Sequence, residues 1–443
     1  HRIAKIARDY FDEHGFIELE TPMLIKSTPE GARDFLVPSR LHHGEFYALP
    51  QSPQLYKQLS MVAGFDRYMQ LARCFRDEDL RADRQPEFTQ IDLEMSFVDV
   101  EDVLAIGEGF MKTVFDKALG EQITLPLPRL TYTEAMERFG SDKPDTRFGM
   151  EIIDLTDTVK DCGFGVFASA VSGGGTVRAI TAKGGAAKLS RKEIDKLTEF
   201  VKGIGAKGLA WVRWVDEKPT ASFAKFMTED EMQALLQKAG AEQGDVVLIV
   251  ADTIKKHVLT TLGALRLEVA DKLGIERSGY QLLWITEFPF FEYDEEAGQY
   301  VAMHHPFTAP LDECIEFLDS APEKVFAKAY DLVLNGVELA SGSIRITDPE
   351  LQAHMFAALG LSPEEAQQKF GFLTDAFRYG APPHGGMGIG LDRLVMQMLG
   401  ADTLRDVVPY PKVQNMTELM TACPSAVDDA QLEELGLQVQ PEA

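Results

Sequence analysis

Charged side chains of both signs crowd into one short stretch, residues 75–92, which reads FRDEDLRADRQPEFTQID. Pro86 removes a backbone donor near its middle and the charges do not gather on one helical face, so we predict two strands joined by a charged loop. Arg76 and Glu78 are two positions apart, so on a strand both side chains should point to the same face. A guanidinium offers a fork of donors to phosphate oxygens, and a carboxylate accepts from an amine. The alternative is a solvated hairpin loop without a ligand.

A glycine-rich run, GGMGIGLDR at residues 385–393, forms a second candidate site. The apolar residues at helical spacing are Leu391, Leu394, Val395, Met398 and Leu399. Arg393 then lies in the first turn of a helix, where backbone donors and the helix dipole favour anions. The glycines run G-x-G-x-G without the expected strand-turn-helix context, and the chain has no Gly-Lys pair, so dinucleotide and P-loop folds are excluded. The alternative is a glycine-rich strand packed tightly against a helix.

Two further groups of polar residues could bind ligands. In GVELASGSIRI, residues 336–346, Glu338 could ligate a hard cation that holds triphosphate oxygens, and Arg345 could pair bidentately with a carboxylate. His304 and His305 are adjacent, so on a strand their side chains would point to opposite faces. A metal shared by both is therefore not predicted, and we expect a separate polar contact for each, with one in reach of a substrate.

The composition is that of a folded globular protein with room for two or three domains: 443 residues, 45% hydrophobic and 26% charged. No run approaches 18 uninterrupted apolar residues and no signal peptide opens the chain, which predicts a soluble, cytoplasmic protein without membrane spans. A net charge of −26 disfavours generic nucleic-acid binding, so local arginines and lysines would have to meet any polyanion. The four cysteines are scattered singly and are expected to be reduced and structural.

Apolar periodicity predicts the elements that carry the N-terminal motifs. Residues 3–11 predict an amphipathic helix, and the chain starts at His1 rather than Met, so we expect it to begin inside a fold, as a fragment or a product without an N-terminal domain. Residues 16–24 predict a strand that stops at Thr21-Pro22, because proline cannot donate to a ladder. Residues 51–63 predict a helix with Ser52 as its N-cap and Pro53 at its first position.

In the middle of the chain, expected helices and strands alternate. Over residues 147–276, capping boxes that start at Ser190 and Thr228 open helices, and strands are expected at 209–215 and 246–251, which predicts a self-contained α/β module. Strand pattern returns at residues 281–292, followed by helices near 348–360 and 363–379.

Together these segments resemble the class II aminoacyl-tRNA synthetases. The resemblance lies in the order of a helix and strand ending at Pro22 (motif 1), the F-R-x-E loop F-T-Q pattern of residues 75–92 (motif 2), and G-x-G-x-x-R at residues 388–393 (motif 3). The segments TPEGARDFLVP (28–38), QSPQLYKQ (51–58) and AMHHPFT (302–308), with residues 75–92, are similar to the bacterial aspartyl-tRNA synthetases. The resemblance covers essentially the whole chain.

This resemblance implies an α+β fold, an antiparallel β-sheet flanked by helices, with an inserted α/β domain between motifs 2 and 3. Residues 1–146 would be the first part of the catalytic core, residues 147–276 the inserted domain, and residues 277–443 the second part of the core with a C-terminal extension. It also implies a homodimer through motif 1. The N-terminal β-barrel with which the family reads the anticodon is not part of this sequence. Ala340 and Ser341 stand where many relatives have glycines.

By matched position, the resemblance also implies roles for the candidate residues. The ATP-binding set would be Arg76, Asp77, Glu78, Gln85, Phe88, Glu338, Gly390, Leu391, Asp392 and Arg393. The aspartate-binding set would be Glu30, Ser52, Gln54, Lys57, Arg76, Asp92, His304, His305 and Arg345. The catalytic residues would be Arg76, Glu338 and Arg393, and Mg²⁺ would be organised by Glu338 together with Asp331.

The implied activity is the ATP-dependent activation of L-aspartate to aspartyl-adenylate and its transfer to the 3′ end of tRNA for aspartate, with tRNA for asparagine left open as a second acceptor. Asparagine placed against Lys57 and Arg345 would leave a desolvated cation without its anion, a loss on the order of 2 to 5 kcal/mol. One alternative is an aspartate-activating amide ligase that works without tRNA. Another is a silent tRNA-binding paralogue, which we would expect to have lost Arg76, Glu338, Arg345 or Arg393, and all four are present.

Overall fold

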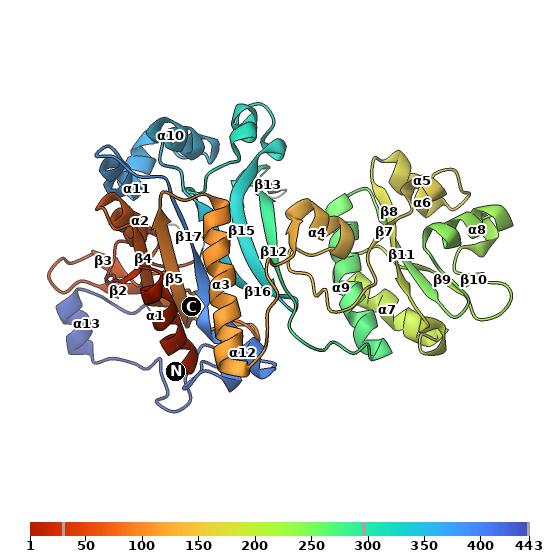
Figure 1. The fold of residues 1–443 in the computed structure, drawn as a ribbon, viewed down its shortest axis with the longest axis horizontal. Helices are drawn as coiled ribbons and strands as arrows, with labels where there is room; N and C mark the ends of the chain where they lie inside the picture. Colours follow the sequence, from red (N-terminus) through yellow and green to blue (C-terminus); the bar gives the residue numbers. More distant parts are fainter. Residues whose placement is uncertain (29–31, 295–297, 441–443) are drawn as a thin grey trace. The chain divides into compact units, whose positions relative to one another are not determined.

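The computed structural model describes residues 1–28, 32–294 and 298–440, which form two compact units (Figure 1). The first unit comprises residues 1–128, 286–332 and 338–443, and the second comprises residues 129–285 and 333–337. The segment predicted as an inserted domain, residues 147–276, lies wholly within the second unit, which extends beyond it at both ends.

Helices and strands of the first unit fall on both sides of the second unit in sequence. The helices are α1 (Arg2–Glu13), α2 (Gln54–Val62), α3 (Val100–Leu119), α10 (Pro349–Ala358), α11 (Pro363–Phe377), α12 (Leu391–Leu399) and α13 (Asp429–Leu435). The strands are β1 (Ile17–Glu18), β2 (Leu36–Pro38), β3 (Phe46–Ala48), β4 (Arg67–Phe75), β5 (Glu87–Ser96), β12 (Leu282–Pro289), β13 (Phe291–Asp294), β14 (Gln299–Ala302), β15 (Phe326–Leu334), β16 (Val337–Ile344) and β17 (His384–Gly390).

A largely antiparallel sheet forms the centre of the first unit, with strands in the order β1-β4-β5-β17-β16-β15-β12. The short β1 pairs in parallel with β4, while β5 pairs antiparallel with both β4 and β17, and β17 pairs antiparallel with β16. Strand β5 alternates with period two: Ile91, Leu93 and Met95 are in the core, whereas Asp92 and Glu94 point to the other face. The pattern of this strand therefore sets one apolar face and one polar face.

Helices flank this sheet. α1 packs against α3 and α12, and α12 also packs on β5, while α2 packs on β4 and β5 with α11 behind it. The predicted N-terminal helix is confirmed, because the buried residues of α1 are those of the expected apolar face: Ile3, Ile6, Ala7, Tyr10 and Phe11. These contacts fix α2 and the start of α12, the two helices that supply side chains to the site described below.

The second unit is an α/β module of its own. Its helices and strands are β6 (Arg129–Thr131), α4 (Tyr132–Phe139), β7 (Ile153–Asp154), α5 (Thr156–Val159), α6 (Gly165–Ser172), β8 (Thr176–Ala182), α7 (Arg191–Gly203), β9 (Ala210–Arg213), β10 (Thr220–Ala221), α8 (Glu229–Lys238), β11 (Val246–Asp252) and α9 (Lys255–Leu273). A five-stranded sheet runs in the order β10-β9-β11-β8-β7. The capping box predicted at Thr228 and Glu231 is confirmed. Of the box predicted at Ser190, only the N-cap half forms: Ser190 accepts from Glu193 N, whereas the Glu193 carboxylate accepts from Lys196 Nζ.

Three local predictions differ from the structure. The strand expected over residues 16–24 is reduced to β1, since beyond it Thr21 donates its hydroxyl to Gln70 Oε1 and Pro22 has no amide to donate. The N-cap of α2 is Pro53, not Ser52. A strand does precede the motif 3 helix, because β17 runs directly into α12; it pairs antiparallel with β5 and β16, unlike the parallel strands of a dinucleotide fold.

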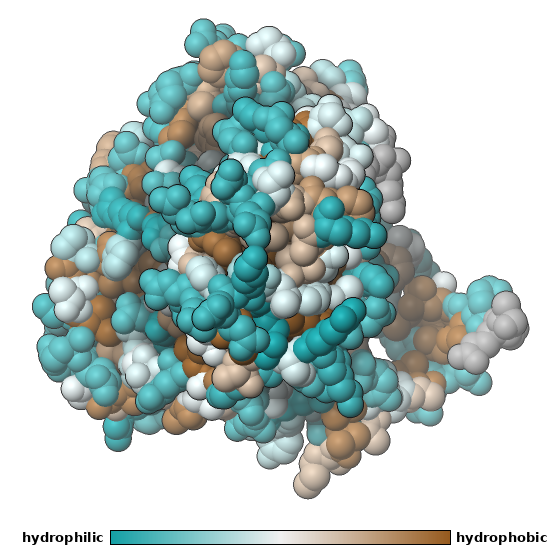
Figure 2. Space-filling model, turned by 90° about the vertical axis from the view of Figure 1, so that its right-hand side faces the viewer, coloured by the Kyte–Doolittle hydropathy of each residue, from teal (hydrophilic) through white to brown (hydrophobic). Residues whose placement is uncertain are grey.

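The surface carries mixed side chains, and on the face shown in Figure 2 hydrophilic residues predominate with hydrophobic ones interspersed. Within the part of the chain that the structure describes, no helix is both long and apolar enough to span a bilayer. None of the four cysteines forms a disulfide, as predicted, and Cys74, Cys162 and Cys314 are buried.

Candidate active site

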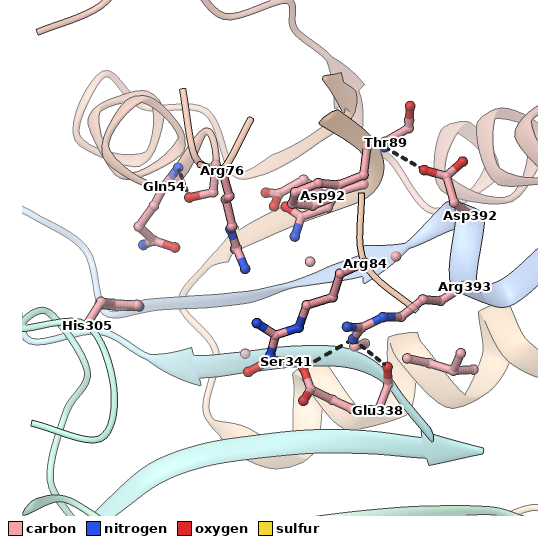
Figure 3. Close-up of a pocket in the computed structure, with 18 of the residues that line it drawn as sticks. Gln54, Arg76, Arg84, Thr89, Asp92, His305, Glu338, Ser341, Asp392 and Arg393 are labelled. Carbon is pink, nitrogen blue, oxygen red and sulfur yellow. Dashed lines mark hydrogen bonds and ion pairs between the residues drawn. The ribbon is translucent and has the colours of Figure 1, made fainter. Parts of the chain in front are cut away.

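A cavity of about 420 Å³ opens in the first unit, on the polar face of β5. It is bounded by the β4–β5 loop, by β16 and β17, by the first turn of α12 and by the segment that follows β14. Arg76 and Arg84 reach it from the β4–β5 loop, and Arg393 reaches it from α12 (Figure 3). A cavity with several convergent cations suits a ligand with multiple negative charges.

Most of the candidate residues come together in this cavity although they are spread over more than 300 positions of sequence. Those that line it are Ser52, Gln54, Lys57, Arg76, Glu78, Gln85, Phe88, Asp92, His304, His305, Glu338, Arg345, Gly390, Asp392 and Arg393. Asp77, Asp331 and Leu391 are not among its lining residues. Asp77 instead pairs with Arg33, its Oδ2 lying 3.7 Å from Arg33 Nε. Glu30 lies outside the described residues.

A buried charge cluster forms one end of the cavity. Lys57 of α2 places Nζ 2.8 Å from Asp92 Oδ1 and 3.2 Å from Glu94 Oε2. The side chains of these three residues are only 3%, 2% and 0% exposed, respectively. Buried charges are tolerated only when they are paired, because each has lost the hydration that stabilises it in water.

Arg345 belongs to the same cluster. Its Nε donates to Glu94 Oε1 at 2.9 Å and its Nη2 to Glu94 Oε2 at 3.2 Å, a bidentate pair, while Nη1 contacts His305 Nε2 and Ser343 Oγ, each at 2.6 Å. Burial opposes ionisation of Glu94, but the charges of Arg345 and Lys57 outweigh it and lower the pKa of Glu94 to about 2. Glu94 is therefore a permanent anion shared by the two cations.

Asp92 behaves differently from Glu94. Burial raises the pKa of Asp92, and the nearby charge of Glu94 adds to the rise, although Lys57 and Arg345 oppose it. A carboxylate in this position gains from an additional cation, since a second positive charge would offset the lost hydration. Asp92 is thus suited to receive an ammonium group from a ligand.

Glycines of β17 make room for both carboxylates. In the β17–β5 register, Gly386 lies opposite Glu94 and Gly388 opposite Asp92. A Cβ on Gly386 would lie 2.3 Å from Glu94 Oε2 and 2.0 Å from Leu93 O, distances that side chains do not tolerate. The glycine run is therefore a strand packed against a helix, and it also clears space for charged side chains in the site.

The other end of the cavity carries an aromatic ring and an arginine pair. The Arg76 guanidinium lies over the Phe88 ring, 5.2 Å from its centroid. Arg393, in the first turn of α12 as predicted, donates from Nη1 to Glu338 O at 3.1 Å and pairs through Nη2 with Asp83 Oδ2 at 3.2 Å (Figure 3). A planar ring with cations beside it is the arrangement that holds a nucleobase next to its phosphates.

The β4–β5 hairpin was predicted as two strands joined by a charged loop, and this is confirmed by the antiparallel pairing of β4 with β5. Within the loop, Glu78 accepts from Arg84 Nη1 at 3.0 Å. Gln85 lines the cavity, yet its side-chain amide also makes two hydrogen bonds with the backbone of Lys412. Asp392 accepts from Thr89 N at 3.0 Å, and burial raises the pKa of this carboxyl group.

The two histidines both line the cavity, although a strand would have sent them to opposite faces. They lie after the end of β14 at Ala302, so the strand assumed for them is wrong. Burial lowers the pKa of His304 to about 4 and, with the charge of Arg345, lowers that of His305 as well. His304 Nε2 is buried and has no hydrogen-bond partner among the described residues, so it is available to a ligand.

Sequence reasoning missed four residues of the site: Asp83, Arg84, Glu94 and Lys412. Glu94 had a readable signal, because it follows Asp92 by two positions on a predicted strand and so shares its face. Asp83 and Arg84 were within the quoted loop but were not given roles. Lys412 had no signal, since it is separated from its partner Gln85 by 327 positions.

At the end of the cavity that holds Phe88 and Arg393, protein side chains can supply only some of the ligands that a divalent cation needs. Glu338 lines the cavity and its side chain is 35% exposed, so its carboxylate can accept a hard cation. No group of three or more potential ligand side chains occurs among the described residues. Such an ion would therefore take most of its ligands from phosphate oxygens and water, as Mg²⁺ commonly does.

Comparison with known proteins agrees with this geometry. The model of the family "tRNA synthetases class II (D, K and N)" matches residues 1–414. The chain is 60% identical over 444 residues to the aspartate–tRNA ligase of Ruminiclostridium cellulolyticum, covering 100% of this chain and 74% of that protein. It is 57% identical over 439 residues to the aspartate–tRNA(Asp/Asn) ligase of Caldanaerobacter subterraneus subsp. tengcongensis, covering 99% and 74%.

A solved structure supports the fold. The asparaginyl-tRNA synthetase of Entamoeba histolytica, in complex with asparaginyl-adenylate, superposes with a TM-score of 0.51 at 19% identity, covering 94% of this chain and 66% of that one. The α+β fold implied by the sequence, with its antiparallel sheet flanked by helices, is thereby confirmed. A match over residues 1–414 and this shared fold place the chain in a known family: it belongs to the class II tRNA synthetases of the D, K and N group.

Proposed function

We propose that the chain is an aspartate–tRNA ligase, which activates L-aspartate with ATP to aspartyl-adenylate and transfers the aspartyl group to the 3′ end of tRNA. The observation that carries the substrate is the charge of the buried cluster. If Asp92 faces the ammonium of the amino acid, the remaining groups are two cations, Lys57 and Arg345, and one anion, Glu94. Their sum of +1 is neutralised by a side-chain carboxylate and not by an amide.

Both ends of aspartate find partners of the right kind. His304 Nε2, which has no partner among the described residues, can serve the side-chain carboxylate beside Arg345 and His305. Arg76 lines the cavity between the buried cluster and Phe88, where it can hold the α-carboxylate and the α-phosphate together. The two reacting groups are both anions, so a shared guanidinium lowers their repulsion and aligns them.

The chemistry is an in-line attack by the aspartate α-carboxylate on the α-phosphorus, with pyrophosphate as the leaving group. Arg76 neutralises the reacting centre, Arg393 takes the charge of the distal phosphates, and Phe88 stacks on the adenine. Mg²⁺, held by Glu338 with the phosphate oxygens, would supply further neutralisation of the triphosphate. The catalytic work of the protein is positioning and electrostatics, without a protein nucleophile.

Pyrophosphate exchange into ATP tests the first half of this proposal. We expect exchange that depends on L-aspartate, with L-asparagine and L-glutamate at least tenfold less effective, since each ~1.4 kcal/mol of lost pairing is one decade. Exchange driven equally well by asparagine would contradict the charge argument. Exchange without any amino-acid dependence would contradict the activity itself.

Aminoacylation tests the second half, including the acceptor. Transcripts of tRNA for aspartate and tRNA for asparagine should be offered separately, because the relatives described above include one named for tRNA(Asp/Asn). We expect aspartylation of tRNA for aspartate. Activation of aspartate with transfer only to ammonia or another small amine would favour the amide ligase, and tRNA binding without exchange would favour the silent paralogue. Because the acceptor is used in translation, we also propose a cytoplasmic location, which cell fractionation tests.

We also propose that the protein is a homodimer formed through its N-terminal segment. β1 is an edge strand of the sheet, and Ile17 and Leu24 beside it are 50% and 53% exposed. An open strand edge with exposed apolar side chains is a surface that a second copy can cover. Sedimentation analysis should give twice the chain mass of 49.2 kDa, and Ile17→Glu should shift the equilibrium toward the monomer.

A further inference from the structure

The first three residues of β5 extend past the end of their neighbour β17. Gly390, the last residue of β17, lies opposite Gln90, whereas Glu87, Phe88 and Thr89 pair only with β4. This leaves the adenine-stacking Phe88 on a strand end that is supported by a ladder on one side alone. Strand ends of this kind fray unless other groups hold them.

Lys412 contacts the side chains of Gln85 and Glu87, which lie just before Phe88. Its backbone N donates to Gln85 Oε1 at 2.8 Å and its backbone O accepts from Gln85 Nε2 at 3.1 Å, so the Gln85 amide is bound at both of its ends. Its Nζ forms an ion pair with Glu87. Lys412 thus holds the residues at positions −3 and −1 relative to Phe88, and Asp392 holds Thr89 at +1 through the amide.

Glu87 connects Lys412 to the opposite strand. Its Oε2 lies 2.8 Å from Arg73 Nη2 on β4, and Arg73 Nη1 donates to Thr89 Oγ1 at 3.3 Å. Burial would raise the pKa of Glu87, but the hydrogen bonds from Lys412 and Arg73 outweigh it and lower that pKa, so the carboxylate stays charged. The anion is therefore clamped between a strand residue and a residue of the C-terminal segment.

The segment around Lys412 is itself a built structure. Lys412 forms a β-bridge with Glu418, and Val413 N donates to Thr417 O at 2.9 Å. Glu418 is 5% exposed, and its carboxylate accepts hydrogen bonds from the backbone N of Met420 and of Thr421. A turn locked in this way presents Lys412 in one place.

We propose that Lys412 is a positioning residue for the nucleotide: through Gln85 and Glu87 it fixes the start of β5 so that Phe88 is held ready for the adenine. The proposal rests on the proposed function, because it takes the ligand of Phe88 to be the adenine of ATP. It predicts a defect that is specific to ATP, since Lys412 contacts neither the buried charge cluster nor the residues that hold aspartate.

The test uses the full chain with Lys412→Met, which keeps the side-chain stem and removes the charge, and Glu87→Gln. Pyrophosphate exchange gives KM for ATP and for aspartate separately, and binding of a fluorescent ATP analogue gives Kd without turnover. We expect each variant to raise KM and Kd for ATP about tenfold, the effect of one charge-assisted hydrogen bond at ~1.4 kcal/mol per decade. KM for aspartate should stay within about twofold of wild type.

Two further variants make the test specific. The double variant Lys412→Met with Glu87→Gln should be no worse than Glu87→Gln alone, because Glu87→Gln already removes the ion pair with Lys412 as well as the one with Arg73. Lys412→Arg should recover most of the ATP affinity, since it keeps the charge. Lys328→Met is the matched control. Lys328 lies in the same unit, and its side chain is 18% exposed, close to the 20% of Lys412. It pairs with Asp312, and neither residue lines the cavity.

Several results would overturn the proposal. Unchanged ATP affinity in both single variants would do so, as would additive effects in the double variant. Equal rises in KM for ATP and aspartate with a lowered melting temperature would show a general structural role instead. If Lys412→Met does not fold, Glu87→Gln and Lys412→Arg carry the same comparison. Absence of aspartate-dependent exchange in the wild type would contradict the proposed function, whereas ATP-analogue binding would still test Lys412.

Discussion

Arg345 and Glu94 meet through two parallel contacts in the interior of the site, Nε to Oε1 at 2.9 Å and Nη2 to Oε2 at 3.2 Å. Arg345 lies at the end of β16 and Glu94 lies on β5, so β17 runs between the strands that carry them. Both side chains have almost no exposure, 2% and 0%. This pair fixes the guanidinium that the substrate carboxylate is proposed to meet, and it makes the amino-acid site sensitive to any change in its charge.

Replacing Arg345 by leucine should abolish aspartate-dependent pyrophosphate exchange. The substitution removes the cation for the substrate carboxylate and leaves Glu94 with Lys57 as its remaining cation, so we also expect a loss of stability of roughly 3 to 5 kcal/mol. Exchange assays and urea unfolding measure the two effects. Arg378→Leu is the control, because Arg378 is 74% exposed and pairs only with Asp375 at 3.5 Å. Near-normal exchange in Arg345→Leu would contradict the role proposed for Arg345.

Gly386→Ala should damage the site through β5, because the added Cβ would meet both the Leu93 carbonyl oxygen, at 2.0 Å, and the Glu94 carboxylate. The added Cβ would lie 2.3 Å from Glu94 Oε2, so the carboxylate has to move and carry Arg345 with it. We expect a destabilisation of about 1 to 3 kcal/mol from overpacking and a higher KM for aspartate. Gly203→Ala, at the end of α7 with nothing within 4 Å of its Cβ, should change neither. An unaltered KM for aspartate in Gly386→Ala would show that Glu94 does not position Arg345.

Asp83→Asn should lower KM for ATP. In the structure Asp83 forms an ion pair with Arg393, with Asp83 Oδ2 3.2 Å from Arg393 Nη2. A phosphate that binds Arg393 must therefore displace this carboxylate. The pair is partly exposed, 24% and 41%, and such pairs contribute about 0.2 to 1 kcal/mol, which corresponds to a gain of up to roughly fivefold. Steady-state exchange at low and high salt measures it, and the gain should shrink at high salt. A higher KM would mean that Asp83 assists ATP binding instead of competing with it.

Stability should fall as the pH drops from about 6.5 toward 4. Burial lowers the pKa of His304 to about 4, and it also lowers those of His305 and His384, whereas histidine in an unfolded chain titrates near ~6.5. Between these values the unfolded state binds more protons, so the contribution of the neutral histidines is complete above ~6.5 and is lost toward 4. Urea midpoints at pH 7 and pH 5 should differ less for His304→Gln than for wild type. Identical pH dependence in the two proteins would argue against a buried neutral His304.

Chelation of divalent cations should stop exchange without unfolding the protein. Among the described residues no group of three potential ligands exists, so the ion is expected to enter with the nucleotide rather than to stabilise the fold. EDTA should therefore abolish exchange while leaving the melting temperature of the nucleotide-free protein unchanged. Glu338→Gln should raise the Mg²⁺ concentration needed for half-maximal rate. A melting temperature that falls on chelation would reveal a structural ion instead.

The sequence was most informative where a side chain and its spacing carry the chemistry. The charge pattern and Pro86 of residues 75–92 predict two strands joined by a loop, and the helical spacing from Leu391 predicts the turn that presents Arg393. Resemblance to the family added roles for Lys57, Asp92 and Arg345, which converge in one cavity.

Other features depend on the tertiary fold and had no local signal. The β17 strand was obscured because glycine has low strand propensity, yet the fold uses these glycines to accommodate Asp92 and Glu94. The turn after β14, which brings His304 and His305 to one cavity, is set by packing rather than by periodicity. The contact of Gln85 with Lys412 joins residues that no pattern within a short window can relate.

The contact between Gln85 and Lys412 also bears on the order in which the protein is made. Since 327 positions separate these residues, the support for Phe88 is completed only after Lys412 has been synthesised. A chain interrupted before Lys412 would retain Arg76, Phe88 and Arg393 but not the clamp that holds the strand end between them. Chains that stop before Lys412 would therefore be poor consumers of ATP even though they contain the residues that contact it.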